Sequence, residues 1–231
     1  MKQIAVVTAC GLFVCLSAAI HTSAKPIPQQ DVNQRAQDGF TPLMRAAHKG
    51  QLNVVRALLK QGAEVDAKYG ATAMMLAAQE GHLPVVRTLL AAGANPNASV
   101  FTPHAGEITA LMWGIMSRNI GVVRALMKAG AKVNPRTAEG DTPLMMAAQF
   151  GSVAIIKTLL AAGADVNASR SNGYTALMVA ADSPEPEIAR ALIAAGADVN
   201  ARNKFRETAL YLARKANNDE VVALLKRAGA K

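Results

Sequence analysis

One short motif returns six times along this chain and limits its fold to a narrow class. Each copy has a threonine, then Pro or Ala, then Leu or Met, then Met or a final Tyr, and the period is about 33 residues. The copies begin at Thr41, Thr72, Thr109, Thr142, Thr175 and Thr208. Self-similarity at this period predicts a row of stacked units, because such a unit cannot bury an apolar face alone.

The copy that begins at Thr142 predicts two short helices. Thr142 can cap the first helix, and Pro143 fits its first turn because no amide hydrogen is needed there. Gly151 breaks that helix, and Gly163 ends the second one in a left-handed conformation. The second helix has an apolar face with helical spacing, made of Val153, Ile155, Ile156, Leu159 and Leu160.

The pattern Thr-Pro-Leu-x-x-Ala-Ala, a glycine, Val-Val-x-x-Leu-Leu and Gly-Ala-Asp-Val-Asn-Ala resembles the ankyrin repeat. The resemblance covers the chain from about residue 31 to its C-terminus. It implies an all-α solenoid of six helix pairs, an ankyrin-repeat array with projecting β-hairpin fingers. One departure is systematic, because the usual histidine after Thr-Pro-Leu is a methionine in five copies and Tyr211 in the last.

The domain boundaries follow from the same pattern. We expect a cleaved signal peptide at 1–24, a lead-in with half a finger at 25–36, and one repeat array at 37–231. The units fall at about 37–68, 69–101, 102–136, 137–169, 170–202 and 203–231. Arg45 and Lys226 occupy positions that are apolar in inner units, which is typical of solenoid caps, so we expect no further domain.

The N-terminal segment is typical of a bacterial secretory signal peptide. Lys2 precedes an uncharged, mostly apolar stretch at 4–20, and small residues lead to Ala24, after which we expect cleavage. An uncleaved membrane anchor and lipidation at Cys10 are the alternatives. Both cysteines, Cys10 and Cys15, lie in this segment, so the mature chain would have no disulfide. We expect a periplasmic protein, with secretion from the cell as the alternative.

The charge balance indicates a basic surface. The formal net charge is +9, and only 4% of residues are aromatic. Nucleic acid is a disfavoured partner, because export separates the chain from it and so few aromatics provide no stacking platform. An anionic membrane surface or envelope polymer remains an open alternative.

The sequence contains no familiar constellation of catalytic residues. There is no glycine-rich phosphate loop, no Gly-x-Ser-x-Gly elbow and no His-Glu-x-x-His helix. His82 stands where ankyrin repeats often have a structural histidine, and His48 and His104 are isolated. We therefore predict that the protein is not an enzyme and that it has no cofactor and no metal site.

Two recurring residue types are predicted to be structural. The methionine after each Thr-Pro-Leu motif fits core packing, although a methionine ladder that handles copper is an alternative. These residues are Met44, Met75, Met112, Met145 and Met178.

Recurring amides are expected to hydrogen-bond the backbones of neighbouring fingers. These residues are Asn33, Asn97, Asn134, Asn167 and Asn200, with Asp66 in the remaining place.

The basic residues divide into two rows. One row lies at the same position of each second helix and is expected to be a solvated outer face. It comprises Arg56, Arg87, Arg124, Lys157 and Arg190. The other row lies on the fingers and includes Arg136, Arg170 and Arg202, where positive charge would steer an acidic partner.

The third unit carries the most distinctive local feature. About four extra residues fall within 99–108, and insertions in a solenoid often lie on the binding face. Phe101 and His104 are expected to be exposed near the tip of this finger. Met116 and Phe150 are expected on the concave surface beside it. Together they predict an apolar centre with a basic rim, which is typical of a binding hot spot.

We therefore predict an exported protein-interaction module that acts through its concave and finger face. The expected partner is another protein of acidic character, and the chain is expected to be a monomer. An inhibitor or immunity protein that blocks an enzyme is the alternative within this class. Copper handling by the methionines is the alternative from a different class.

Overall fold

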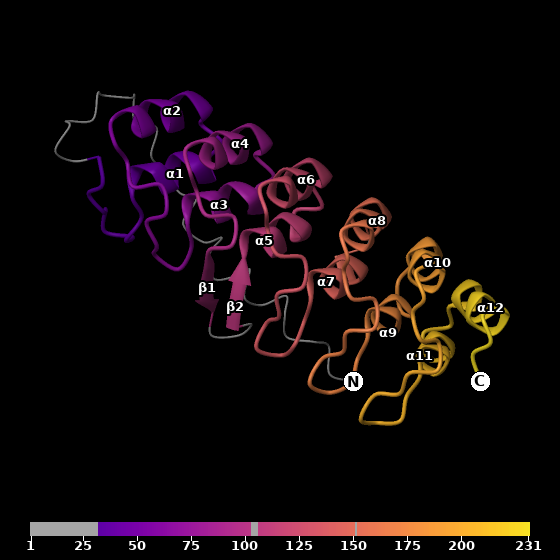
Figure 1. Ribbon diagram of the computed structural model, residues 1–231. Helices are drawn as coiled ribbons and strands as arrows, with labels where there is room; N and C mark the ends of the chain where they lie inside the picture. The colour runs from indigo at the N-terminus through magenta and orange to yellow at the C-terminus, as the bar shows by residue number, and fades with distance from the viewer. Residues whose placement is uncertain (1–31, 103–105, 151) are drawn as a thin grey trace.

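The chain forms a row of short helices that pack side by side (Figure 1). The computed structural model describes residues 32–102, 106–150 and 152–231. The helices there are α1 (Pro42–His48), α2 (Leu52–Lys60), α3 (Ala73–Gln79), α4 (Leu83–Ala91), α5 (Ala110–Met116), α6 (Ile120–Lys128), α7 (Pro143–Phe150), α8 (Val153–Ala161), α9 (Ala176–Ala180), α10 (Pro186–Ala194), α11 (Ala209–Lys215) and α12 (Asp219–Arg227). The predicted signal peptide and Gly151 lie outside the described residues.

The recurring threonine starts each odd-numbered helix, as the sequence predicted. Its side-chain oxygen accepts a hydrogen bond from the backbone nitrogen three residues later, at 3.2–3.4 Å. One such cap stabilises a helix by about 1 kcal/mol. The helices are only five to eight residues long, so these caps satisfy a large share of their free amide hydrogens.

Each even-numbered helix ends two residues before the glycine of a Gly-Ala pair. Gly163 has a φ of 84° after α8, so the predicted left-handed cap is present. The backbone nitrogen of Ala164 donates to the carbonyl oxygen of Leu159 at 3.0 Å, which closes the end of the helix. The chain then turns towards the next finger.

Two layers of helices share one core along the row. The odd-numbered helices form the layer next to the fingers, and the even-numbered helices form the outer layer (Figure 1). In α8, Ile155, Ile156 and Leu159 are fully buried, whereas Val153 and Leu160 are half-buried. Each pair thus completes its burial against its neighbours, which is the packing expected of a solenoid.

The insertion in the third predicted unit forms a two-stranded antiparallel hairpin. Strand β1 (Ser99–Thr102) pairs with β2 (Gly106–Thr109), and Phe101 lies opposite Glu107. The other fingers of the described chain form no paired strands and are closed by one or two backbone hydrogen bonds, such as the one from the nitrogen of Thr137 to the carbonyl oxygen of Asp141 at 3.0 Å. The finger before α9 adds an isolated bridge between Ser169 and Thr175.

The two ends of the row carry charged side chains at positions that are apolar in the inner units. Arg45 in α1 is only partly exposed, because it forms an ion pair with Asp38 at 2.7 Å. The hydrogen bond from Arg45 lowers the pKa of Asp38 below its usual value. A lowered carboxyl pKa stabilises the fold above the unfolded-state pKa of about 4, and this contribution is lost as pH falls through the lower folded-state pKa. Lys226 in α12 is exposed at the opposite end.

A comparison of two glycines tests the close packing of the fingers. Gly173 has a φ of 83°, and a Cβ there would lie 2.9 Å from the backbone Cα of Asn203. Gly163 has a φ of 84° with nothing within 4 Å of an added Cβ. We expect Gly163→Ala to cost about 1 kcal/mol from backbone strain alone. Gly173→Ala should cost clearly more in urea unfolding, because the neighbouring finger must also move. Equal losses would contradict tight finger packing.

Candidate protein-interaction surface

A ladder of hydrogen bonds fixes each finger to the next one. Asn97 accepts from the backbone nitrogen of Lys132 at 2.7 Å and donates to the carbonyl oxygen of Gly130 at 2.9 Å. The other recurring amides and Asp66 accept a bond from the next finger in the same way. The predicted structural role of these residues is confirmed. The fingers are therefore held in a regular row along one edge of the molecule (Figure 1).

Two finger arginines brace this row. Arg35 donates to the carbonyl oxygen of Lys68 at 3.1 Å, and Arg136 donates to that of Ser169 at 2.9 Å. Both contacts join one finger to the next. Both arginines are exposed, so their charge still faces solvent while their geometry is fixed by the backbone.

Arg170 departs from the sequence prediction. It was expected as an exposed cation, but it is only 7% exposed and pairs with Asp141 of the preceding finger. Burying a charge is costly unless an opposite charge and hydrogen bonds compensate it, and Asp141 provides both. Arg170 therefore holds two fingers together, and its charge is not presented to a partner.

Phe101 is the most exposed large apolar side chain among the described residues. It is 74% exposed on β1, whereas its neighbour Val100 is buried. Its predicted exposure is confirmed. His104, which was expected beside it, lies outside the described residues.

Met116 and Phe150 are more enclosed than the sequence suggested. Both are half-buried at the ends of α5 and α7 and pack against the common core. The expected free apolar patch on the concave surface is therefore reduced to their outer faces. The physical reason is that a helix of seven or eight residues has no end that lies far from its neighbours.

Sequence reasoning missed three other exposed aromatic residues. Tyr69, Phe205 and Tyr211 are 50%, 70% and 51% exposed. Tyr69 and Phe205 lie on fingers. Tyr211 lies at the end of the stack, at the motif position where inner pairs have a methionine covered by the following pair. A search for aromatic residues within the finger segments would have found the first two.

Tyr69 is partly held by the finger before α1. Its ring packs edge-on against Phe40, with centroids 6.0 Å apart, and Arg35 lies 5.8 Å from its centre. The ring also covers Gly39, where a Cβ would come within 2.2 Å of it. Its outward half remains available to a partner.

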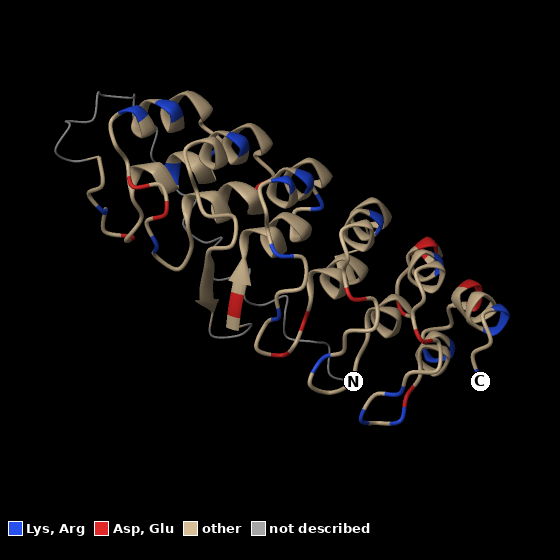
Figure 2. Cartoon of the chain, viewed as in Figure 1, with Lys and Arg blue, Asp and Glu red and all other residues tan. Residues whose placement is uncertain are grey.

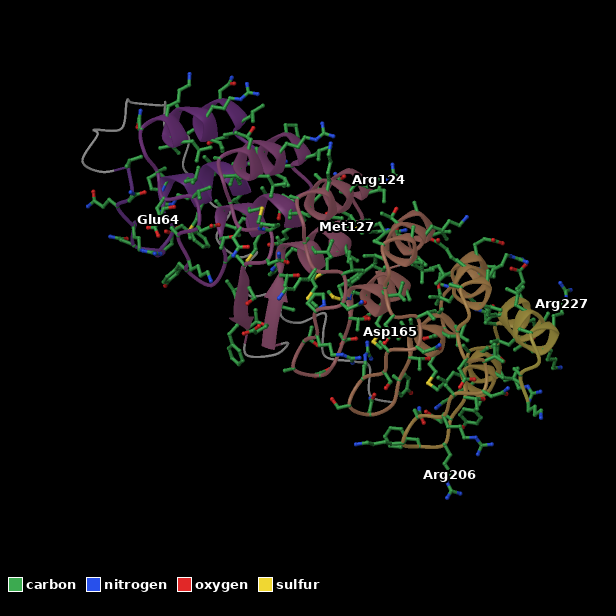
Figure 3. The ribbon with its side chains drawn as sticks, viewed as in Figure 1. Glu64, Arg124, Met127, Asp165, Arg206 and Arg227 are labelled. Atoms are coloured by element: carbon green, nitrogen blue, oxygen red, sulfur yellow. The ribbon has the colours of Figure 1, made fainter. Side chains whose placement is uncertain are left out.

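The basic row on the outer helices is fully solvated, as expected. Each of its five members is exposed, and Arg190 pairs with Glu187 at 3.1 Å. Figure 2 shows these cations on the upper helices, away from the fingers. Arg124 on α6 and Arg206 on the last finger therefore face opposite sides (Figure 3).

The histidines of the described residues have structural contacts. His82 hydrogen-bonds the carbonyl oxygen of His48 at 3.1 Å, which ties two neighbouring loops together. His48 lies 3.6 Å from Glu80. Within residues 32–102, 106–150 and 152–231, no group of three or more His, Cys, Asp or Glu residues could hold a metal ion.

Family comparison identifies the repeat. The model described as ankyrin repeats (three copies) matches residues 13–100, 102–170 and 155–231. The chain belongs to the ankyrin-repeat family. This membership agrees with the threonine caps, the helix pairs and the hydrogen-bonded fingers described above. A search of curated proteins gave no match.

Two solved ankyrin-like structures resemble this chain closely. A complex of a predatory endopeptidase from Bdellovibrio bacteriovorus with an immunity protein contains a chain that is 31% identical, with a TM-score of 0.74. That alignment covers 84% of this chain and 99% of the other. An ankyrin repeat domain from Acinetobacter baumannii is 30% identical with a TM-score of 0.73, over 82% of this chain and 98% of that domain.

Across the described segments, none of the helices has the length and apolar character needed to cross a membrane.

The five motif methionines generate a prediction about copper. Met44, Met75, Met112 and Met145 are fully buried and Met178 is 2% exposed, so their sulfur atoms pack inside the core. We expect titration of the folded protein with Cu(I) to show no stoichiometric binding, because a soft ion cannot reach these sulfurs. A tight one-to-one complex that Met75→Leu and Met145→Leu abolish would contradict this interpretation.

Proposed function

We propose that this chain is an exported, non-enzymatic protein-interaction module, an array of six ankyrin helix pairs whose finger edge binds an acidic protein. One observation carries the proposal. Four large apolar side chains of the described residues are strongly exposed, and three of them, Tyr69, Phe101 and Phe205, lie on fingers. Exposed aromatics grouped on one edge of a protein mark interaction sites more often than random surface.

The charge of this edge supports an acidic partner. Arg35, Lys68, Arg136 and Arg202 are exposed cations along the fingers, in a chain whose net charge is +9. Complementary charge raises association rates and rejects partners of like charge. The export of the chain rests on the sequence of its N-terminal segment, which lies outside the described residues.

Substitution of Phe101 tests the proposal. We expect Phe101→Ala to weaken capture of the native partner from an envelope extract by about tenfold, because truncating an aromatic anchor typically costs over 1 kcal/mol of binding. Tyr211→Ala is the control, since Tyr211 is also a strongly exposed aromatic residue, at 51%, but lies at the end of the stack and not on a finger. The measurement is quantitative mass spectrometry of proteins retained by each immobilised variant.

The outcomes of this experiment are distinct. Unchanged capture by Phe101→Ala would remove the finger hairpin from the proposal. A larger loss with Tyr211→Ala would move the interface to the C-terminal end of the row.

A second candidate function is inhibition of an enzyme. The similarity to a chain in the complex of an endopeptidase with an immunity protein supports this candidate loosely, at 31% identity over 84% of this chain. A protein of this kind would bind over the active site of an enzyme and block access of the substrate.

An activity assay separates the two candidates. If the captured partner is a peptidase, we expect its activity to fall to background when one molar equivalent of this chain is added. Phe101→Ala should restore the activity, and Tyr211→Ala should not. Full activity in the presence of a saturating excess of the chain would exclude inhibition and leave a non-inhibitory interaction module.

A further inference from the structure

Three of the arginines on the fingers are already engaged within the protein. Arg35 and Arg136 donate to backbone oxygens of the following finger, and Arg170 is buried against Asp141. Rotating any of them towards a partner would break a contact that positions the fingers. The freely available positive charge must therefore come from elsewhere on this edge.

The finger between α10 and α11 carries that charge. Arg202, Lys204 and Arg206 are exposed, and in the described part of the chain their side chains make no hydrogen bond or ion pair. Figure 2 shows them as the blue tip at the lower end of the row. Arg206 points away from the helices (Figure 3).

The carboxylate next to the three cations, Glu207, is engaged in other contacts. Glu207 accepts from Asn203 at 2.8 Å and from the hydroxyl of Tyr174 at 3.1 Å, and it lies 3.9 Å from Lys215. Burial, followed by the contact with Glu207, raises the pKa of Tyr174, so this hydroxyl stays a neutral donor. Glu207 is half-buried and does not offset the three cations at the tip.

A large apolar side chain stands among these cations. Phe205 is 70% exposed between Lys204 and Arg206. An aromatic anchor next to unpaired cations combines the two residue classes that dominate binding energy in protein interfaces.

The backbone of the tip is strained in a way that the other fingers avoid. Arg206 has a φ of 60°, in the left-handed region that favours glycine. It lies two residues before the capping threonine, where four other fingers have a glycine. These are Gly39, Gly70, Gly140 and Gly173, all with positive φ. A charged residue kept at a strained position, where glycine serves elsewhere, indicates a function for its side chain.

The tip is also held rigidly. The side-chain oxygen of Asn203 accepts from the backbone nitrogens of Phe205 and Glu207, both at 2.9 Å. The backbone nitrogen of Lys204 donates to Asn172 of the preceding finger at 3.0 Å. A preorganised tip loses little conformational entropy when it binds.

We propose that the tip of the α10–α11 finger, formed by Arg202, Lys204, Phe205 and Arg206, is a docking site for an acidic polypeptide segment with an apolar residue between its carboxylates. The segment would belong to the partner of the proposed function, on which this inference rests. Its carboxylates meet the three cations, and its apolar side chain covers Phe205.

The distribution of acids favours a polypeptide over an anionic membrane. A flat surface that touched the row of fingers would also approach Glu107 on β2 and Glu139 on the α6–α7 finger, both exposed (Figure 2). Like charges would oppose that contact. A short segment can engage the last finger alone and avoid both carboxylates.

Peptide binding by the mature chain tests this proposal directly. The probe is a fluorescein-labelled peptide, Glu-Glu-Leu-Leu-Glu-Glu, followed by fluorescence anisotropy at low salt. The first variant is the triple substitution Arg202→Gln, Lys204→Gln and Arg206→Gln. The matched control is Arg56→Gln, Arg87→Gln and Arg124→Gln, which removes the same charge from the outer helices.

We expect the finger variant to bind the peptide about tenfold more weakly, because three exposed ion pairs are removed and each contributes little by itself. The control should lose less than about twofold, because its charges lie on α2, α4 and α6, which are not neighbours of the α10–α11 finger. Equal losses would show that only net charge matters and would overturn the proposal, as would no loss in either variant.

A second arm uses vesicles of equal parts phosphatidylcholine and phosphatidylglycerol, measured by co-sedimentation. We expect no binding that depends on the three finger cations. Vesicle binding that disappears in the finger variant, together with no peptide binding, would assign the tip to a lipid surface instead.

Arg206→Gly separates function from folding. We expect its Tm to rise by about 3 °C, because glycine relieves the left-handed strain, while peptide affinity falls. Wild-type affinity would show that Arg206 does not contact the peptide.

If peptide binding is absent but Phe101→Ala still weakens partner capture, this inference fails and the proposed function stands. If Phe101→Ala changes nothing, the proposed function fails by itself.

Discussion

Neighbour-to-neighbour packing of short helix pairs supports everything else in this protein. The helices of the described chain are five to nine residues long, and isolated helices of that length are not stable in water. Residues such as Ile156 and Leu159 are completely buried, and their helix α8 packs against α6 and α10 of the neighbouring pairs as well as against α7. A solenoid built in this way has one continuous core and two exposed edges. Contacts with a partner are made at these edges.

The hydrogen bonds between fingers decide which part of the finger edge is available for binding. The asparagine ladder and the arginine braces fix the spacing of the fingers and occupy part of their polar surface. The buried pair of Arg170 and Asp141 removes one more cation from solvent. What remains is unequal along the edge, with the exposed Phe101 on the β1–β2 hairpin and a cationic tip around Phe205.

The accuracy of the sequence predictions followed the range of the interactions involved. The threonine caps, the left-handed Gly163 and the buried methionines depend on a unit and its nearest copy, and these were predicted correctly. Exposure of Phe101 was also predicted, because an insertion has no equivalent neighbour to cover it. Met116 and Phe150 were expected to be freer than they are, since their contacts come from the common core.

The sequence alone determined the repeat, the helix pairs, the cap residues and the amide ladder, because each rests on residue type at a fixed spacing. Only the tertiary structure decided which finger cations are free. The sequence placed Arg170 and Arg202 in one row of finger cations, although they differ by one position in the repeat. Asp141 of the preceding finger neutralises Arg170, whereas nothing in the described chain pairs with Arg202. Only the structure shows that Arg206 adopts the left-handed backbone for which four other fingers use a glycine at the same position.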